Sequence, residues 1–114
     1  MPNAASVRED IPPGTLDLLI LKTLDREGEL HGFQIADSIQ TLSQDVLQVE
    51  EGSLYPALQR MLMKGWISGE WGKTPENRRA RYYRLTRDGR KQLQNTLARY
   101  ERVSAAIGRV LQPA

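Results

Sequence analysis

The alternation of hydrophobic and polar residues is most regular between residues 50 and 65. At about 100° per residue, four apolar side chains gather on one face of a helix. Pro56 fits a helix only in its first turn, where the N–H that proline lacks has no partner anyway, and Gly65 is a typical helix end. We therefore expect a short helix with Leu54, Leu58, Met61 and Leu62 on its buried face and Ser53, Pro56, Gln59, Arg60, Met63 and Lys64 across from them.

A β-hairpin is predicted directly after this helix. Residues 66–72 and 81–86 have the imperfect alternation of two paired strands, and the polar, basic segment 73–80 forms the loop between them. Trp71, close to the loop, either packs within the hairpin or forms an exposed aromatic platform. The helix alone also fits an ordinary amphipathic surface helix. Followed by a basic hairpin, it is typical of a winged helix-turn-helix, whose second helix enters the major groove of DNA.

Two more helices are predicted before this pair. The first starts after Thr15 as its cap, and its apolar residues between Leu16 and Leu24 surround nearly the whole circumference. A helix with apolar residues on every side must be covered on more than one side. The second runs from about His31 to Ser43 and has a buried stripe formed by Ile35, Ala36, Ile39 and Leu42. The predicted fold class is therefore α+β, mainly helical with a small β-hairpin.

A long final helix is expected from Thr86, as its cap, to about Leu111. Its apolar residues recur at steps of four and three, which is the spacing of a helix-packing seam. Pairing between two subunits is favoured over pairing within one, because a chain this small buries only a modest core. The candidate dimerisation residues are Leu16, Leu19 and Ile20 in the first helix and Leu93, Leu97, Tyr100, Ile107 and Leu111 in the last.

These patterns divide the chain into three parts. Residues 1–13 contain three prolines and no periodicity, so a flexible N-terminal arm is expected there. Residues 14–86 contain the helices and the hairpin of the winged helix-turn-helix. Residues 87–114 contain the dimerisation helix and a short tail.

The net charge of +2 conceals an uneven distribution. Residues 1–59 carry three Lys or Arg and ten Asp or Glu, a net charge of −7, whereas residues 60–114 carry thirteen and four, a net charge of +9. Between Lys73 and Lys91, eight basic residues accompany two acidic ones. Such a run is usually a solvated charged face, but its position in a hairpin beside a candidate reading helix favours a polyanionic partner.

Other features narrow the function class. The chain has no cysteine, its longest apolar run is four residues, and no secretory segment precedes that run, so a cytoplasmic location is expected. His31 is the single histidine, and at a helix start it is more often a capping or packing residue than a ligand or base. No phosphate-binding loop or Ser-His-Asp arrangement is present. We expect a protein that is not an enzyme and needs no cofactor.

Several motifs together resemble the PadR family of transcriptional regulators. They are the apolar run 16–24, the segments 31–36, 51–58 and 64–67, and the run Arg81–Gly89, which occur in the family's order and at about its spacing over residues 14–100. The runs Gly-Ser-Leu-Tyr-Pro-Ala-Leu and Tyr-Arg-Leu-Thr-x-x-Gly are the most specific. This chain has one helix after the hairpin and so resembles the short form of the family.

The resemblance implies a dimeric winged-helix repressor in which the first and last helices build the dimer. It places Ser53, Tyr55, Pro56, Gln59 and Arg60 on or beside the major-groove face and Lys73, Arg78 and Arg79 in the wing. Tyr55 borders the apolar face, so part of its ring is expected in the core while its hydroxyl reaches a phosphate. Some family members sense small aromatic molecules or drugs at the dimer, and no residue here identifies such an effector.

The expected function is therefore sequence-specific binding of double-stranded DNA by a homodimer on a near-palindromic operator. Lys73, Arg78, Arg79 and Arg81 supply phosphate contacts, while Gln59 or Arg60 contacts bases and Lys64 adds a charge to the outward face of the helix. The alternative is a winged helix that binds protein through its hairpin without specific DNA binding. A basic wing disfavours that alternative.

Overall fold

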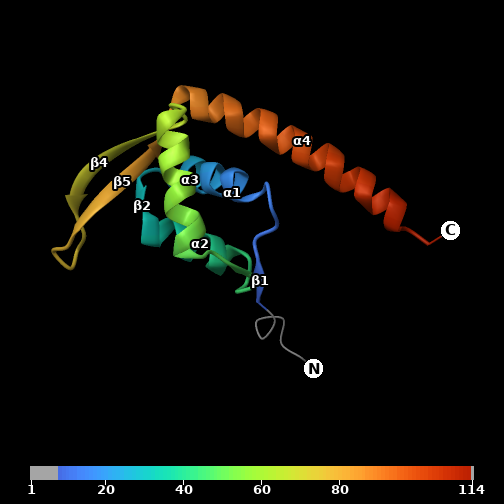
Figure 1. Cartoon of the computed structure of the whole chain (residues 1–114), viewed down its shortest axis with the longest axis horizontal. Coiled ribbons are helices and arrows are strands. Elements are labelled where there is room, and N and C mark those ends of the chain that lie inside the picture. The colour runs from blue at the N-terminus through green and yellow to red at the C-terminus, as the bar shows by residue number, and fades with distance from the viewer. Residues whose placement is uncertain (1–7, 114) are drawn as a thin grey trace.

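The computed structural model describes residues 8–113, which form four helices and five strands (Figure 1). The class expected from the sequence, mainly helical with a small antiparallel sheet, is confirmed. The helices are α1 (Leu16–Glu27), α2 (Gly32–Leu42), α3 (Glu51–Met63) and α4 (Arg87–Leu111). The strands are β1 (Glu9–Asp10), β2 (Leu30–His31), β3 (Leu47–Gln48), β4 (Ile67–Lys73) and β5 (Arg79–Leu85).

Helix α1 lies at the centre of the core. It packs against α2, α3, α4 and β5, and Ile20 and Leu21 on it have no exposed surface. This arrangement explains why apolar residues occur around nearly its whole circumference. Helix α3 buries Leu54, Leu58 and Met61 against this core, as its periodicity predicted, and Leu62 is half-buried at the edge.

The sheet has three strands in the order β2-β5-β4. Strands β4 and β5 form the predicted hairpin, but its loop is shorter than the expected 73–80. Thr74 closes the turn, because its N–H donates to the Arg78 carbonyl and its hydroxyl accepts from the Arg78 N–H. Lys73 and Arg79 therefore lie opposite each other in the strands. Strand β2, which the sequence analysis did not predict, pairs with the other edge of β5 through only two residues.

Some predicted helix ends differ from the observed ones. Helix α1 continues to Glu27, three residues beyond the apolar run that ends at Leu24. Thr15 stands at the start of α1, but its hydroxyl donates to the Pro12 carbonyl and does not cap the helix. Thr86 does cap α4, because its hydroxyl accepts from the Gly89 N–H. In α2, Leu42 is exposed and was wrongly placed in the buried stripe.

The arm expected over residues 1–13 is partly a strand. Glu9 and Asp10 pair in parallel with β3, and Ile11 packs against the core. The prediction of a flexible arm was wrong for these residues, because β1 pairs with β3, a distant segment that no local sequence pattern indicates. Residues 1–7 lie outside the described part of the chain.

Helix α4 has two halves with different environments. Its first half packs on α1, with Leu93 buried and Leu97 half-buried, whereas its second half projects away from the other helices (Figure 1). The molecule accordingly measures 56 Å along its longest axis and 22 Å along its shortest. Among residues 8–113, no helix combines the length and the apolar character that a membrane span requires.

Gly89 fixes how closely α4 approaches the hairpin. A Cβ atom on it would lie 1.9 Å from the Trp66 carbonyl oxygen, a contact that backbone must move to relieve. We predict that Gly89→Ala lowers the free energy of unfolding by about 2 kcal/mol or more, measured by urea denaturation. Gly52→Ala in α3, where a Cβ meets nothing within 4 Å, is the control and should leave that free energy unchanged or slightly raised. Equal stability of the two variants would contradict the prediction.

Candidate nucleic-acid interface

The outward face of α3 carries Tyr55, Pro56, Gln59 and Met63, all of which are exposed. They point away from the core because Leu54, Leu58 and Met61 occupy the opposite side of the helix. Ser53 is also exposed at the first turn. This face therefore offers a continuous surface on which polar and apolar side chains stand together.

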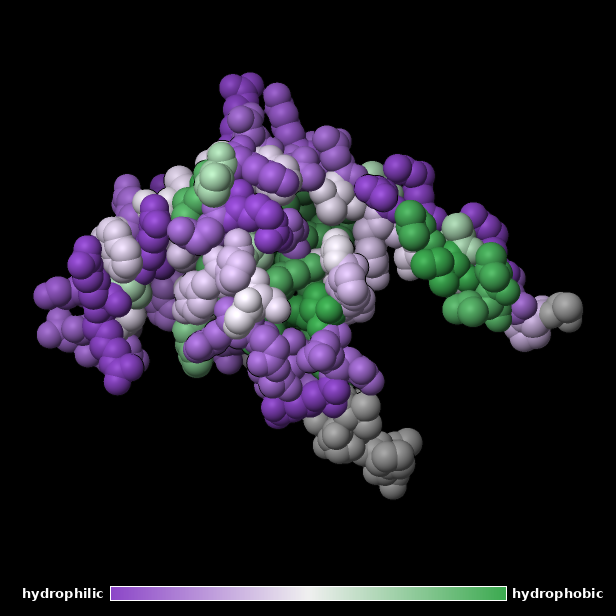
Figure 2. All heavy atoms as spheres, viewed as in Figure 1, coloured by the Kyte–Doolittle hydropathy of each residue, from purple (hydrophilic) through white to green (hydrophobic). Residues whose placement is uncertain are grey.

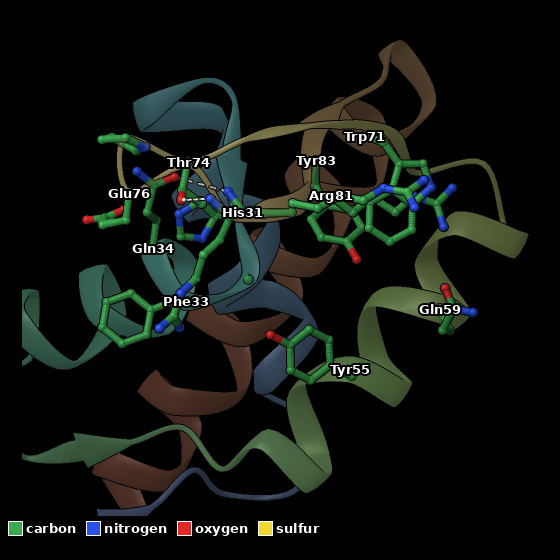
Figure 3. Close-up of a pocket in the computed structure, with 15 residues that line it drawn as sticks. His31, Phe33, Gln34, Tyr55, Gln59, Trp71, Thr74, Glu76, Arg81 and Tyr83 are labelled. Carbon is green, nitrogen blue, oxygen red and sulfur yellow. Dashed lines mark hydrogen bonds between the residues drawn. The ribbon is translucent and has the colours of Figure 1, made fainter.

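A cleft of about 1050 Å³ separates α3 from the hairpin and the first turn of α2. Tyr55 and Gln59 line it from α3, and Trp71, Arg81 and Tyr83 line it from the hairpin (Figure 3). The two elements predicted to act together thus share one concave surface.

The cations of the hairpin gather on the side of the sheet that faces this cleft. Lys73 pairs with Arg79 and Trp71 pairs with Arg81 across the two strands, so all four side chains lie on one face. Tyr83 and Leu85 continue that face into the core and are buried. Figure 2 shows the hydrophilic residues that cover the hairpin.

Arg78 and Arg84 flank this group of cations. Arg78 is exposed at the end of the turn. Arg84 lies on the opposite face of the hairpin, where its Nη2 atom is 3.1 Å from Glu29 Oε2. The basic run found in the sequence is therefore divided between two faces, and only part of it borders the cleft.

Arg60 does not join the cleft. It lies on the flank of α3 that faces α1, and its Nη2 atom is 2.7 Å from Asp17 Oδ1. Lys64, further along α3, has its ammonium 4.7 Å from the centre of the Trp66 ring. Of the two residues expected to contact bases, only Gln59 borders the cleft, while Arg60 is paired with Asp17 in the first turn of α1.

The first turn of α2 contributes residues that the sequence analysis did not assign to the site. Phe33 is 72% exposed at the cleft. Gly32 allows close packing there, because a Cβ on it would lie 2.9 Å from the Tyr55 hydroxyl. An exposed phenylalanine beside a helix start was the available signal for this part of the site. Tyr55 itself remains partly exposed, as expected for a residue at the border of the apolar face.

His31 has a structural role at the start of α2. Its backbone N–H donates to Gln34 Oε1, and its ring lies edge-on to the Tyr82 ring with the two centres 5.3 Å apart. These contacts agree with the expectation of a capping or packing residue.

Among the titratable groups of the cleft, Tyr83 is the one whose pKa the environment clearly shifts. Burial raises the pKa of the Tyr83 phenol, the neighbouring Arg81 guanidinium opposes part of that rise, and Tyr55 adds to it. The phenol therefore stays neutral in the folded protein at pH values where a free phenol ionises.

The candidate dimerisation residues separate into three groups by burial. Ile20 and Leu93 are 0% and 4% exposed, so they belong to the core of one protomer and offer no surface to a second. Leu16, Leu19 and Leu97 are half-buried around that core. Tyr100, Ile107 and Leu111 are exposed on the second half of α4. Together with the exposed Val103 and Val110, they form the hydrophobic patch of that half of the helix (Figure 2).

The chain is similar in sequence to known proteins. The sequence model of the "Transcriptional regulator PadR-like family" matches residues 20–95. An uncharacterised protein of Lysinibacillus sphaericus is 30% identical over 101 residues, which cover 89% of this chain and 92% of that protein.

Solved structures show the same fold. A transcriptional regulator from Clostridium thermocellum superposes with a TM-score of 0.78 at 27% identity, covering 87% of this chain and 95% of that one. The structure of Bacillus subtilis PadR in complex with operator DNA superposes with a TM-score of 0.65 at 26% identity. That match covers 75% of this chain and 48% of the B. subtilis protein.

The raised pKa of Tyr83 predicts a loss of stability in alkali. Above pH 10 or so, the unfolded chain gains stability by ionising this phenol while the folded chain keeps it neutral, so the free energy of unfolding falls until the folded pKa is passed. Urea denaturation at pH 9 and pH 11 should show a smaller fall for Tyr83→Phe than for the wild type. The difference between the two proteins should stay constant between pH 7 and pH 8.5. Parallel declines above pH 10 would contradict the prediction.

Proposed function

This chain belongs to the PadR-like family of transcriptional regulators, and we propose that it acts as a homodimeric repressor that binds a near-palindromic operator. The resemblance inferred from its motifs is confirmed by the family match and by the shared winged-helix fold. A transcriptional regulator of this kind acts on DNA. We therefore expect the protein in the cytoplasm.

One observation carries the proposal. The exposed face of α3 and the cationic face of the hairpin border the same cleft, so a duplex that receives α3 in its major groove also meets Lys73, Arg79 and Arg81. The B. subtilis relative was solved with operator DNA, which supports the same class of partner for this chain. A wing that bound protein would more often be acidic or apolar, which disfavours the alternative of a protein-interaction module.

The proposed contacts divide affinity from specificity. Arg78, Arg79, Arg81 and Lys73 contact phosphates, so they supply the salt-dependent part of the affinity on every sequence. Gln59 contacts a base edge, where an amide pairs well with adenine and a good bidentate pair contributes about 1–3 kcal/mol of discrimination. Tyr55 and Ser53 offer hydroxyls to the backbone nearby.

Arg60 has a different proposed role from the one first expected. Its ion pair with Asp17 joins the outer flank of α3 to the first turn of α1, so it holds the Arg60 side chain away from the cleft. Base contact by Arg60 requires that this pair break. We therefore assign discrimination to Gln59 and not to Arg60.

The homodimer is proposed from the second half of α4. Its apolar side chains have no cover in the protomer; Ile107 is 53% exposed and Val110 is 83% exposed. A second copy of the same helix, related by two-fold symmetry, offers a self-complementary surface. Two copies then place their α3 helices about 34–36 Å apart, one turn of DNA, and the bound dimer represses by occupying the promoter.

Capture of genomic fragments by the purified protein tests the function directly. At a stated salt concentration, the protein should retain fragments that share a near-palindromic sequence. Failure to retain any fragment, together with capture of a protein partner, would favour the interaction module instead.

The wing is tested on the recovered fragments. Arg78→Ala combined with Arg79→Ala should weaken binding to every duplex, and the salt slope of the affinity should fall by up to about 4, because a bound dimer loses two phosphate contacts in each subunit. Arg84→Ala is the matched control, since it removes a charge from the same hairpin on the opposite face. An unchanged slope for the double variant would remove the wing from the contacts.

The dimer is tested by placing a charge in the exposed patch. Ile107→Asp should shift the protein from dimer to monomer at micromolar concentration, because the aspartate loses its hydration in the interface. Ala105→Asp, two residues away and so about 160° around the exposed helix, should remain dimeric. Sedimentation equilibrium measures both, and a dimeric Ile107→Asp or a monomeric wild type would contradict the proposal.

A further inference from the structure

Trp71 is a large aromatic residue that the core does not explain. It is 60% exposed, it lies in the part of β4 nearest the hairpin turn, and its ring faces the cleft (Figure 3). Arg79 lies over this ring with its guanidinium carbon 4.3 Å from the ring centre, and the guanidinium carbon of Arg81 is 6.0 Å from the same point. Two cations of the hairpin therefore converge on one exposed indole.

We propose that Trp71 is a positioning residue that holds Arg79 and Arg81 as a preformed pair for one phosphate of the DNA backbone in the cleft. The inference rests on the proposed function, since it names how the hairpin engages the same DNA. It assigns to Trp71 a role in affinity without any direct contact to a base.

A guanidinium that lies over an aromatic ring can still bind an anion. A cation lies over an aromatic ring with its flat face, whereas the N–H groups of a guanidinium point outward in its plane. Arginine held in this way loses less conformational freedom when it meets a phosphate, and its planar fork matches two phosphate oxygens. Exposed arginines on a hairpin that lacked the indole would have to be ordered by the DNA itself.

Gly69 provides the second part of the arrangement. It lies two residues before Trp71 on the same face of β4, opposite Tyr83. A Cβ on Gly69 would lie 2.6 Å from Arg81 Nε, so the side chain of Arg81 crosses the strand through the space that glycine leaves. Arg81 can take this path only because Gly69 carries no side chain.

Arg81 also has a hydrogen-bond donor without an acceptor. Its Nε atom is shielded from solvent and has no hydrogen-bond partner within residues 8–113. A shielded donor without an acceptor is unfavourable, so a small shift of the Arg81 side chain that brings Nε to an anionic oxygen in the cleft would be favoured. The opposite face of the hairpin is held separately, because the Tyr82 hydroxyl donates to the Lys73 carbonyl oxygen at 3.1 Å.

The first test compares Trp71→Leu with Trp71→Phe on an operator fragment recovered by capture. Trp71→Leu should lower DNA affinity about 5- to 30-fold, because the DNA must then order two arginine side chains that the indole no longer holds. Trp71→Phe keeps a ring and should recover most of the affinity. Thermal unfolding of each full-length variant reports whether the hairpin has remained folded.

The second test moves Arg81 without removing any charge or aromatic ring. Gly69→Ala should displace the Arg81 side chain and weaken binding by a similar factor. Gly72→Ala is the matched control, because a Cβ there meets the Tyr82 ring at 3.2 Å on the other face of the hairpin and should leave affinity unchanged. This pair keeps the inference testable if Trp71→Leu fails to fold.

The third test locates the phosphate. Replacing single phosphates of the operator by neutral methylphosphonates should reveal one position in each half-site that weakens binding by the wild type but not by Arg81→Gln. The inference is overturned if Trp71→Leu binds like the wild type, if Phe and Leu weaken binding equally, or if Gly69→Ala and Gly72→Ala behave alike. A wild type that binds no DNA overturns the proposed function instead.

Discussion

The burial of α1 is the interaction on which the rest of the structure depends. Ile20, Leu21 and Leu24 on this helix are almost completely buried, and each such side chain contributes about 1.5–3 kcal/mol when removed from water. Because α2, α3, α4 and β5 all pack on α1, the relative positions of the reading helix, the hairpin and the last helix follow from one shared surface. A change in that surface alters the cleft and the projecting half of α4 together.

The cleft depends on this arrangement for its chemistry as well as its shape. Leu58 and Met61 anchor α3 on one side, and Tyr83 and Leu85 anchor β5 on the other, so the exposed residues of both elements are brought face to face. The alternation of the two strands then places every second residue of the hairpin toward α3. Packing in the core thereby orders a cationic surface several residues away from it.

Charge is separated in space by the same packing. The acidic half of the sequence contains Asp17, which binds Arg60, and Glu29, which binds Arg84. Both ion pairs are exposed enough to add little stability, so their main effect is on where the two arginines point. Neither arginine borders the cleft, whose basic lining residues are Arg78, Arg79 and Arg81 of the hairpin.

The order and type of the main elements follow from local periodicities, which can be read without the structure. The buried face of α3, the hairpin that follows it and the cap of α4 at Thr86 all depend on residues a few positions apart, and the motifs between Leu16 and Gly89 were enough to indicate the family. Gln59 and the wing arginines were identified in the same way, from exposed positions on predicted elements.

Tertiary packing sets which partner each of these residues contacts. The Asp17–Arg60 pair joins residues 43 positions apart, and β1 and β2 each consist of two residues that become strands by pairing with distant partners. Periodicity equally allowed Ile20 and Leu93 to face a second subunit, but the way α4 crosses α1 turns them into the protomer core. Local patterns leave several faces of a helix or strand equally able to be buried, and packing between segments remote in sequence selects one of them. That packing places the face of the hairpin with Trp71, Arg79 and Arg81 beside α3.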